Sequence, residues 1–134
     1  MPPFAVKQPN GRYAVYDTVI DDLYCLDCTA EEAIEVQLHI MHQGCDYPGG
    51  KPGLRADLER EFNNIEQTGK AWPWAKTWRE CLWWCIFYYG VEDDAIQEAL
   101  ELDLATPEEI AVMAEEARRE NERLDAEEEE EEVV

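Results

Sequence analysis

The feature that most constrains the fold is a run of nine apolar residues, 81–89, that contains two tryptophans, one phenylalanine and two tyrosines. A helix that is apolar on all sides has to be covered by other elements, so the run predicts a central helix. Its Trp, Ile, Phe and Tyr content would also suit a strand. The run is less than half as long as a membrane-spanning helix, and Arg79 and Glu80 precede it, so we expect no membrane span.

The first part of the chain predicts a short antiparallel hairpin. Residues 4–7 and 12–16 favour extended structure, and Asn10 and Gly11 between them favour the positive φ angles of a tight turn. A third extended segment is expected within residues 18–26. These segments together predict a small antiparallel sheet.

The rest of the chain predicts helices. Thr29 and Glu32 form the pattern of a capping box, so a helix should begin there and run to about residue 43. Thr106 and Pro107 open another helix in the same way, with proline at the first helical position. Further apolar periodicity predicts helices over residues 54–65, 74–89, 91–102 and 106–124.

These elements define an α+β fold in which a short N-terminal hairpin or small antiparallel sheet is followed by a mostly helical C-terminal part. We expect a hairpin and helix over residues 1–44, and a loop rich in proline and glycine over residues 45–53. A helical part with an aromatic core should follow over residues 54–125. Residues 126–134 contain six consecutive glutamates and should form a disordered acidic tail.

Negative charge is concentrated in the last third of the chain. The whole chain has a net charge of -21, and residues 91–134 contain nineteen acidic and three basic residues. Such a charge argues against direct binding to nucleic acid or to anionic membranes. A protein or ribonucleoprotein partner with a basic groove is expected instead.

The acidic residues of this region have two possible roles. A charged surface usually serves solubility, whereas carboxylates on helix faces can also imitate the phosphates of a nucleic acid. The residues that would bind a basic partner in the second case are Glu92, Asp93, Asp94, Glu98, Glu101, Asp103, Glu108, Glu109, Glu115 and Glu116.

Aromatic residues suggest a second contribution to binding. Eight large rings lie within residues 72–89, and tryptophan and tyrosine are typical both of cores and of binding hot spots. Most of these rings should lie in the core. Trp72 and Trp74, beside Pro73, are the ones we expect to contact a partner.

A group of cysteines and histidines permits a zinc site. The residues are Cys25, Cys28, His39, His42 and Cys45. Their spacing is shorter than that of common zinc fingers, and buried free thiols would explain the cysteines equally well. The Cys25 and Cys28 pair could also be redox-active, although the usual βαβ context is missing. Because the cysteines are odd in number and no signal peptide precedes them, we expect reduced thiols, no cofactor and a cytoplasmic location.

The N-terminal forty residues resemble a group of phage proteins. QPNGRYAVYDTVIDDL at residues 8–23, followed by TAEEA at residues 29–33, is similar to the start of small uncharacterised bacteriophage and prophage proteins. The resemblance implies an accessory role without known catalytic residues. In style, a small acidic phage protein is similar to anti-CRISPR and other anti-defence proteins.

From these observations we expect a non-enzymatic inhibitor that binds a nucleic-acid-binding complex in the host cytoplasm through an acidic, DNA-mimicking surface. Two alternatives remain open at this point. One is a phage morphogenesis factor such as a tail assembly chaperone, and the other is a small zinc-binding interaction module.

Overall fold

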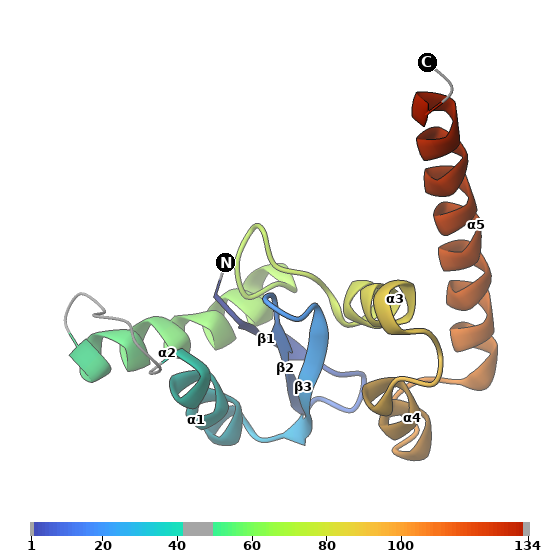
Figure 1. Cartoon of the computed structure of the whole chain (residues 1–134). Coiled ribbons are helices and arrows are strands. Elements are labelled where there is room, and N and C mark those ends of the chain that lie inside the picture. The colour runs from blue at the N-terminus through green and yellow to red at the C-terminus, as the bar shows by residue number, and fades with distance from the viewer. Residues whose placement is uncertain (1, 42–49, 133–134) are drawn as a thin grey trace.

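The computed structural model describes residues 2–41 and 50–132. Three antiparallel strands come first, β1 (Phe4–Lys7), β2 (Tyr13–Asp17) and β3 (Asp22–Cys28). The helices that follow are α1 (Ala30–Met41), α2 (Gly50–Thr68), α3 (Trp78–Tyr89), α4 (Asp94–Glu101) and α5 (Pro107–Glu132). The predicted α+β class is confirmed (Figure 1).

The three strands form a sheet in the order β1-β2-β3 that is covered on both faces. Tyr16 pairs with Phe4 across the sheet, and their stacked rings lie 5.3 Å apart in the core shared with α3. Val15, on the other face, packs with Ala33 of α1. Helices α1 and α2 therefore lie on one side of the sheet, and α3, α4 and α5 lie on the other (Figure 1).

Helix α3 is the central helix that the apolar run predicts. Thr77 caps its start in a complete capping box with Glu80, so the helix begins at Trp78 and not at residue 74. Cys81 and Cys85 are fully buried against the sheet. The opposite face of α3 is only partly covered, since Tyr88 is 52% exposed. The helix is therefore less covered than the apolar run predicts.

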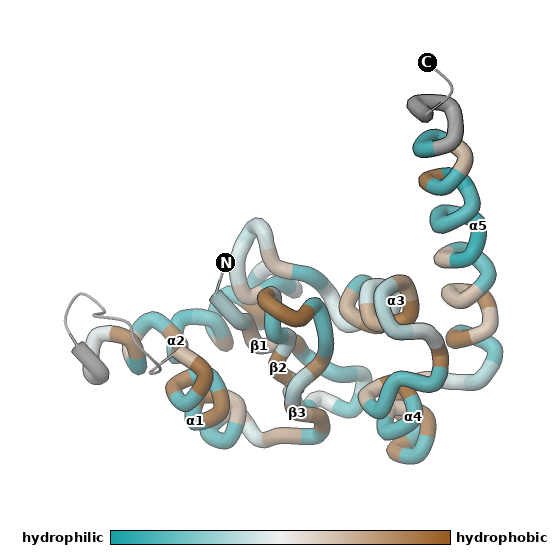
Figure 2. Tube along the Cα trace, viewed as in Figure 1, coloured by the Kyte–Doolittle hydropathy of each residue, from teal (hydrophilic) through white to brown (hydrophobic). Residues whose placement is uncertain are grey.

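Helix α5 is longer than the sequence predicts. Ile110, Met113 and Ala117 pack it onto the body, and from Asn121 onward the described side chains are exposed. The coloured part of this outer half is mostly hydrophilic in Figure 2, and the helix continues to Glu132, through the glutamates expected in a disordered tail. A helix that is polar all round can be held by ion pairs along its own surface, and α5 has several of these.

Helix α2 also starts earlier than expected. It begins at Gly50, so Pro52 lies in the first helical turn, where a missing N–H breaks no intrahelical hydrogen bond. The part of the predicted loop before residue 50 lies outside the described residues. Within residues 2–41 and 50–132, no helix combines the length and the apolar character needed to cross a bilayer.

A buried carboxyl group joins α2 to the edge of the sheet. The N–H of Ala5 in β1 donates a 2.8 Å hydrogen bond to Oε2 of Glu61, which is 1% exposed. Trp72 and Gln37 also hydrogen-bond Glu61. Burial raises the pKa of Glu61 to about 7. Oε1 of Gln37 is buried without a hydrogen-bond partner.

We predict that Glu61→Ala lowers the free energy of unfolding by about 3 kcal/mol, because it leaves the Ala5 N–H unpaired and opens a cavity. Glu61→Gln should cost less, because its amide oxygen can still accept from Ala5. Urea unfolding measures both values. Glu59→Ala, an exposed change on the same helix, is the matched control and should shift the free energy by about 0.5 kcal/mol or less. An equal effect of Glu61→Ala and Glu59→Ala would contradict this role.

The stability that Glu61 contributes should fall as the pH rises. Its pKa is higher in the folded state than the ordinary value of 4.5, so the folded state holds the proton more tightly. The contribution is therefore complete below pH 4.5 and is lost as the pH passes through about 7. From pH 5 to pH 8, the free energy of unfolding of the wild type should therefore fall by about 2 to 3 kcal/mol relative to that of Glu61→Gln. A difference that does not change with pH would disprove the assignment.

Candidate partner-binding surface

The acidic residues predicted to bind a partner lie on α4, on the turns at both of its ends, and on the first half of α5. Asp94, Glu98 and Glu101 are exposed and follow one another at spacings of four and three residues, so they share one face of α4. The turns and the start of α5 add more exposed carboxylates, namely Glu92, Asp103, Glu108 and Glu109.

The arginines of α5 neutralise part of this charge within their own helix. Arg118 pairs with Glu115 and Glu122, and Arg119 pairs with Glu115 at 3.1 Å. Hydrogen bonding from Arg118 lowers the pKa of Glu115 to about 2. Glu116 lies 3.9 Å from Arg79. Glu115 and Glu116 are therefore less available to a partner than the sequence suggests.

The remaining carboxylates have no such compensation. Among the residues that the structure describes, seven exposed acids of this region belong to no ion pair. We call six of them the α4 acidic surface: Glu92, Asp94, Glu98, Glu101, Asp103 and Glu108. Glu109 stands apart, because its Oε1 accepts hydrogen bonds from the backbone and the hydroxyl of Thr106 in a capping box. The structure thus reduces ten predicted residues to six that are exposed and take part in neither an ion pair nor a capping box.

Asp93 differs from the other predicted acidic residues because part of its side chain turns inward. It is the N-cap of α4 but makes no side-chain hydrogen bond to the helix, and its Oδ2 is buried without a partner. Asp93 lies close to Asp22 at the start of β3 and to Cys85 in α3. One carboxylate oxygen from each aspartate and Sγ of the cysteine lie within 4.8 Å of one another. Burial, with Asp22 as the next cause, raises the pKa of Asp93 to about 7. Asp93 is therefore not part of the α4 acidic surface.

The three groups form a cluster that sequence reasoning missed. Sγ of Cys85 donates a 3.2 Å hydrogen bond to Oδ1 of Asp22, and burial raises the pKa of the thiol above its usual range. Nearby, the hydroxyl of Tyr16 donates to Oδ1 of Asp21, and the hydroxyl of Tyr89 donates to the carbonyl of Ile20. Apart from the pair of adjacent aspartates, the sequence holds no signal for this convergence.

The exposed side of α3 carries a continuous aromatic surface. Trp83 stacks on Phe87 at 5.2 Å, and Trp84 stacks on Tyr88 at 5.5 Å. The first three rings are half-buried and Tyr88 is exposed. The terminal tyrosines of the apolar run could have indicated this face, because their hydroxyl groups favour contact with water.

The two tryptophans predicted to contact a partner lie elsewhere, in the segment between α2 and α3. Trp74 is 38% exposed and packs its ring edge-on against Phe4 at 5.8 Å. Trp72 is half-buried and lines a pocket of about 350 Å³ together with Pro73. Both positions leave part of each ring accessible, and their contact with a partner stays a prediction.

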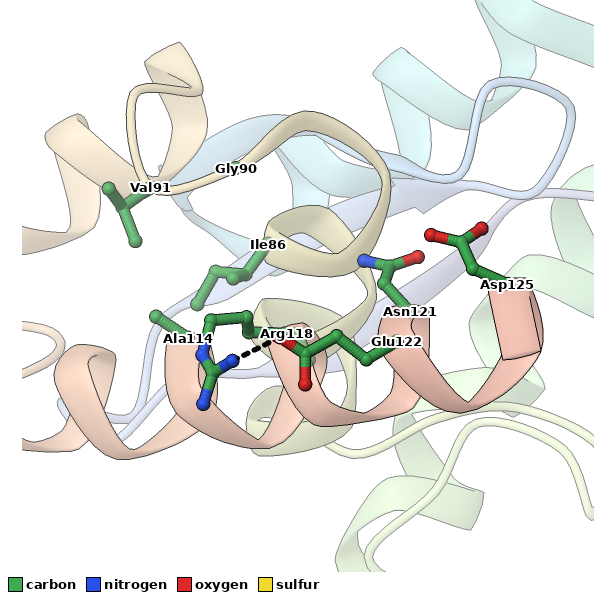
Figure 3. A pocket seen from close by; sticks show the side chains of 9 residues that line it. Ile86, Gly90, Val91, Ala114, Arg118, Asn121, Glu122 and Asp125 are labelled. Carbon is green, nitrogen blue, oxygen red and sulfur yellow. Dashed lines mark hydrogen bonds and ion pairs between the residues drawn. The ribbon is translucent and has the colours of Figure 1, made fainter.

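A second pocket lies between the end of α3 and α5 (Figure 3). It has a volume of about 320 Å³. Ile86 and Val91 form an apolar wall, Ala114 and Ala117 leave room on α5, and Asp125 lies at one end. The pair of Arg118 and Glu122 borders it. The pocket is therefore lined by small apolar surfaces and bordered by charged side chains.

The predicted zinc ligands are not brought together by the described residues. Cys25 and Cys28 form a disulfide, which corrects the expectation of reduced thiols. A regular strand places residues three apart on opposite faces, but a bulge in β3 and the left-handed conformation of Asp27 (φ 57°) turn them to one side. His39 is exposed near the end of α1. His42 and Cys45 lie outside the described residues.

Comparison of the chain with protein-family models, with curated proteins and with solved structures finds no match.

Proposed function

We propose that this chain is a non-enzymatic inhibitor that occupies the basic nucleic-acid-binding groove of a host complex, such as a CRISPR surveillance complex. The observation that supports this proposal is the α4 acidic surface, with its six exposed carboxylates outside any described ion pair. Carboxylates that are not paired within their own chain can pair with lysine and arginine residues of another. The site of action would then be the host cytoplasm, and the ligand is a protein surface and not nucleic acid.

The geometry of α4 suits one strand of a nucleic acid better than a duplex. With a rise of about 1.5 Å per residue, Asp94, Glu98 and Glu101 are spaced by roughly 6 and 4.5 Å along the helix axis. A single strand of a duplex carries one phosphate per roughly 3.4 Å, and both strands together carry one per roughly 1.7 Å. The acidic face therefore approaches the charge spacing of one strand, and we expect it to replace that strand in a groove.

Apolar residues at both ends of α4 complement the charges. Val91 is 38% exposed before the helix and Leu102 is 42% exposed after it. Charge speeds the encounter of two proteins, whereas desolvated apolar side chains slow their separation. Exposed acids together with exposed apolar side chains therefore favour binding of a protein over simple association with small cations.

Glu98→Lys/Glu101→Lys should abolish capture of the target and weaken its binding at least a hundredfold, because two attractive charges become repulsive. The tagged protein is used to capture partners from a host lysate containing a CRISPR system, at low and high salt, with identification by mass spectrometry. We expect a nucleic-acid-binding complex that is released at high salt or by added nucleic acid.

Asp125→Lys/Glu128→Lys is the matched control. It changes the charge by the same amount at two exposed residues of α5 outside the α4 acidic surface. This variant should bind within about threefold of wild type. Equal loss of binding in the two variants would reduce the proposal to a general effect of net charge, and full binding by Glu98→Lys/Glu101→Lys would refute it.

The aromatic surface of α3 favours a second candidate function, that of a phage morphogenesis factor such as a tail assembly chaperone. Partly exposed, mutually stacked rings can cover an aggregation-prone partner. In that case Tyr88→Ala, and not Glu98→Lys/Glu101→Lys, should weaken binding at least about tenfold. The captured partner would be a phage structural protein, and it would resist high salt.

A further inference from the structure

We propose that Asp22, Cys85 and Asp93 bind a Zn²⁺ ion. The three residues come from the start of β3, the middle of α3 and the N-cap of α4, so an ion held by them would join three elements that are far apart in the sequence. The site is separate from the α4 acidic surface and does not depend on the proposed function.

The ligand set and its geometry favour zinc. One atom from each residue lies within 4.8 Å of the other two, and Sγ of Cys85 lies 3.2 Å from Oδ1 of Asp22. Thiolate and carboxylate together are typical of zinc, whereas Mg²⁺ and Ca²⁺ take oxygen ligands. Three protein ligands leave a fourth tetrahedral position for a water molecule.

The cluster also lacks a partner that a cation would supply. Oδ2 of Asp93 is buried and accepts no hydrogen bond, although an N-cap aspartate ordinarily bonds the first turn of its helix. In the described part of the chain, Asp21, Asp22 and Asp93 belong to no ion pair with lysine, arginine or histidine. A buried carboxylate oxygen such as Oδ2 of Asp93 is normally paired with a cation or coordinates a metal.

The fully buried thiol distinguishes this cluster from an ordinary group of surface acids. Cys85 is 0% exposed, and its sulfur is directed at Asp22. On binding, one sulfur–zinc and two oxygen–zinc bonds form, and protons held by the thiol and the carboxyl groups pass to water. No atom changes its oxidation state.

The helix also supplies a matched control. Cys81 lies one turn before Cys85 on α3, is equally buried, and is not a member of the cluster. Replacing either cysteine by alanine removes the same atoms from the same core. A difference in metal binding between the two variants would therefore report on the site and not on packing.

The test uses Co²⁺ as a spectroscopic substitute for zinc, in the full chain carrying Cys25→Ser/Cys28→Ser/Cys45→Ser, so that Cys81 and Cys85 are the remaining thiols. We expect one Co²⁺ per chain and a sulfur-to-cobalt charge-transfer absorption. The absorption should persist after Cys81→Ala and disappear after Cys85→Ala. In the otherwise unchanged chain, Asp93→Asn should weaken Zn²⁺ binding, measured by competition with a chelating dye, at least about tenfold.

Circular dichroism establishes that each variant is folded, and Asp93→Asn keeps the test decisive if loss of a buried thiol unfolds the chain. Absence of the charge-transfer band in the folded parent, or its persistence after Cys85→Ala, would overturn the proposal. Zinc binding that survives Asp93→Asn but disappears in Cys25→Ser/Cys28→Ser would also overturn it, and would assign the metal to the other cysteines.

Discussion

The hydrogen bond from the Ala5 N–H to Glu61 is the interaction on which the packing of α1 and α2 against the sheet depends. β1 is an edge strand, and an unpaired edge amide is open to pairing with another chain. Here the amide is satisfied by a buried carboxyl group of α2 instead. Gln37 of α1 hydrogen-bonds the same carboxyl group, which therefore ties both α1 and α2 to the sheet, whose other face carries α3. The elements on either side of the predicted proline- and glycine-rich loop therefore form a single packed body.

Local signals in the sequence predict the elements well, and long-range contacts are what they miss. The Asn10 and Gly11 turn and the Thr29 and Thr106 helix starts all lie where the pattern indicates, because each depends on residues within one turn. The sequence does indicate that Glu61 is buried, because it lies three residues after Leu58 and four before Ile65, on the apolar face of its helix. The convergence of Asp22 with Cys85 could not be predicted, since 63 residues separate them.

The distribution of ion pairs explains why α5 is long. It also explains why the proposed binding surface lies mainly on α4 and not on α5. Each of the three arginines in the last third pairs with glutamates three or four residues away on α5. Such pairs contribute about 0.3 to 0.5 kcal/mol each, which favours helix where the tail was expected to be disordered. No arginine is left for α4. The sequence reveals the total charge, but only the fold reveals which part of it is uncompensated.

Asp93 connects the two proposed sites physically. Its neighbour Asp94 faces outward on the α4 acidic surface, whereas Asp93 turns inward to Asp22 and Cys85. Without a side-chain bond to the first turn, the N-terminus of α4 lacks the anchor that an aspartate N-cap normally provides. A zinc ion held by the three residues would supply that anchor from outside the helix. It would fix the start of α4 to β3 and α3, and so fix the direction in which the outward carboxylates point.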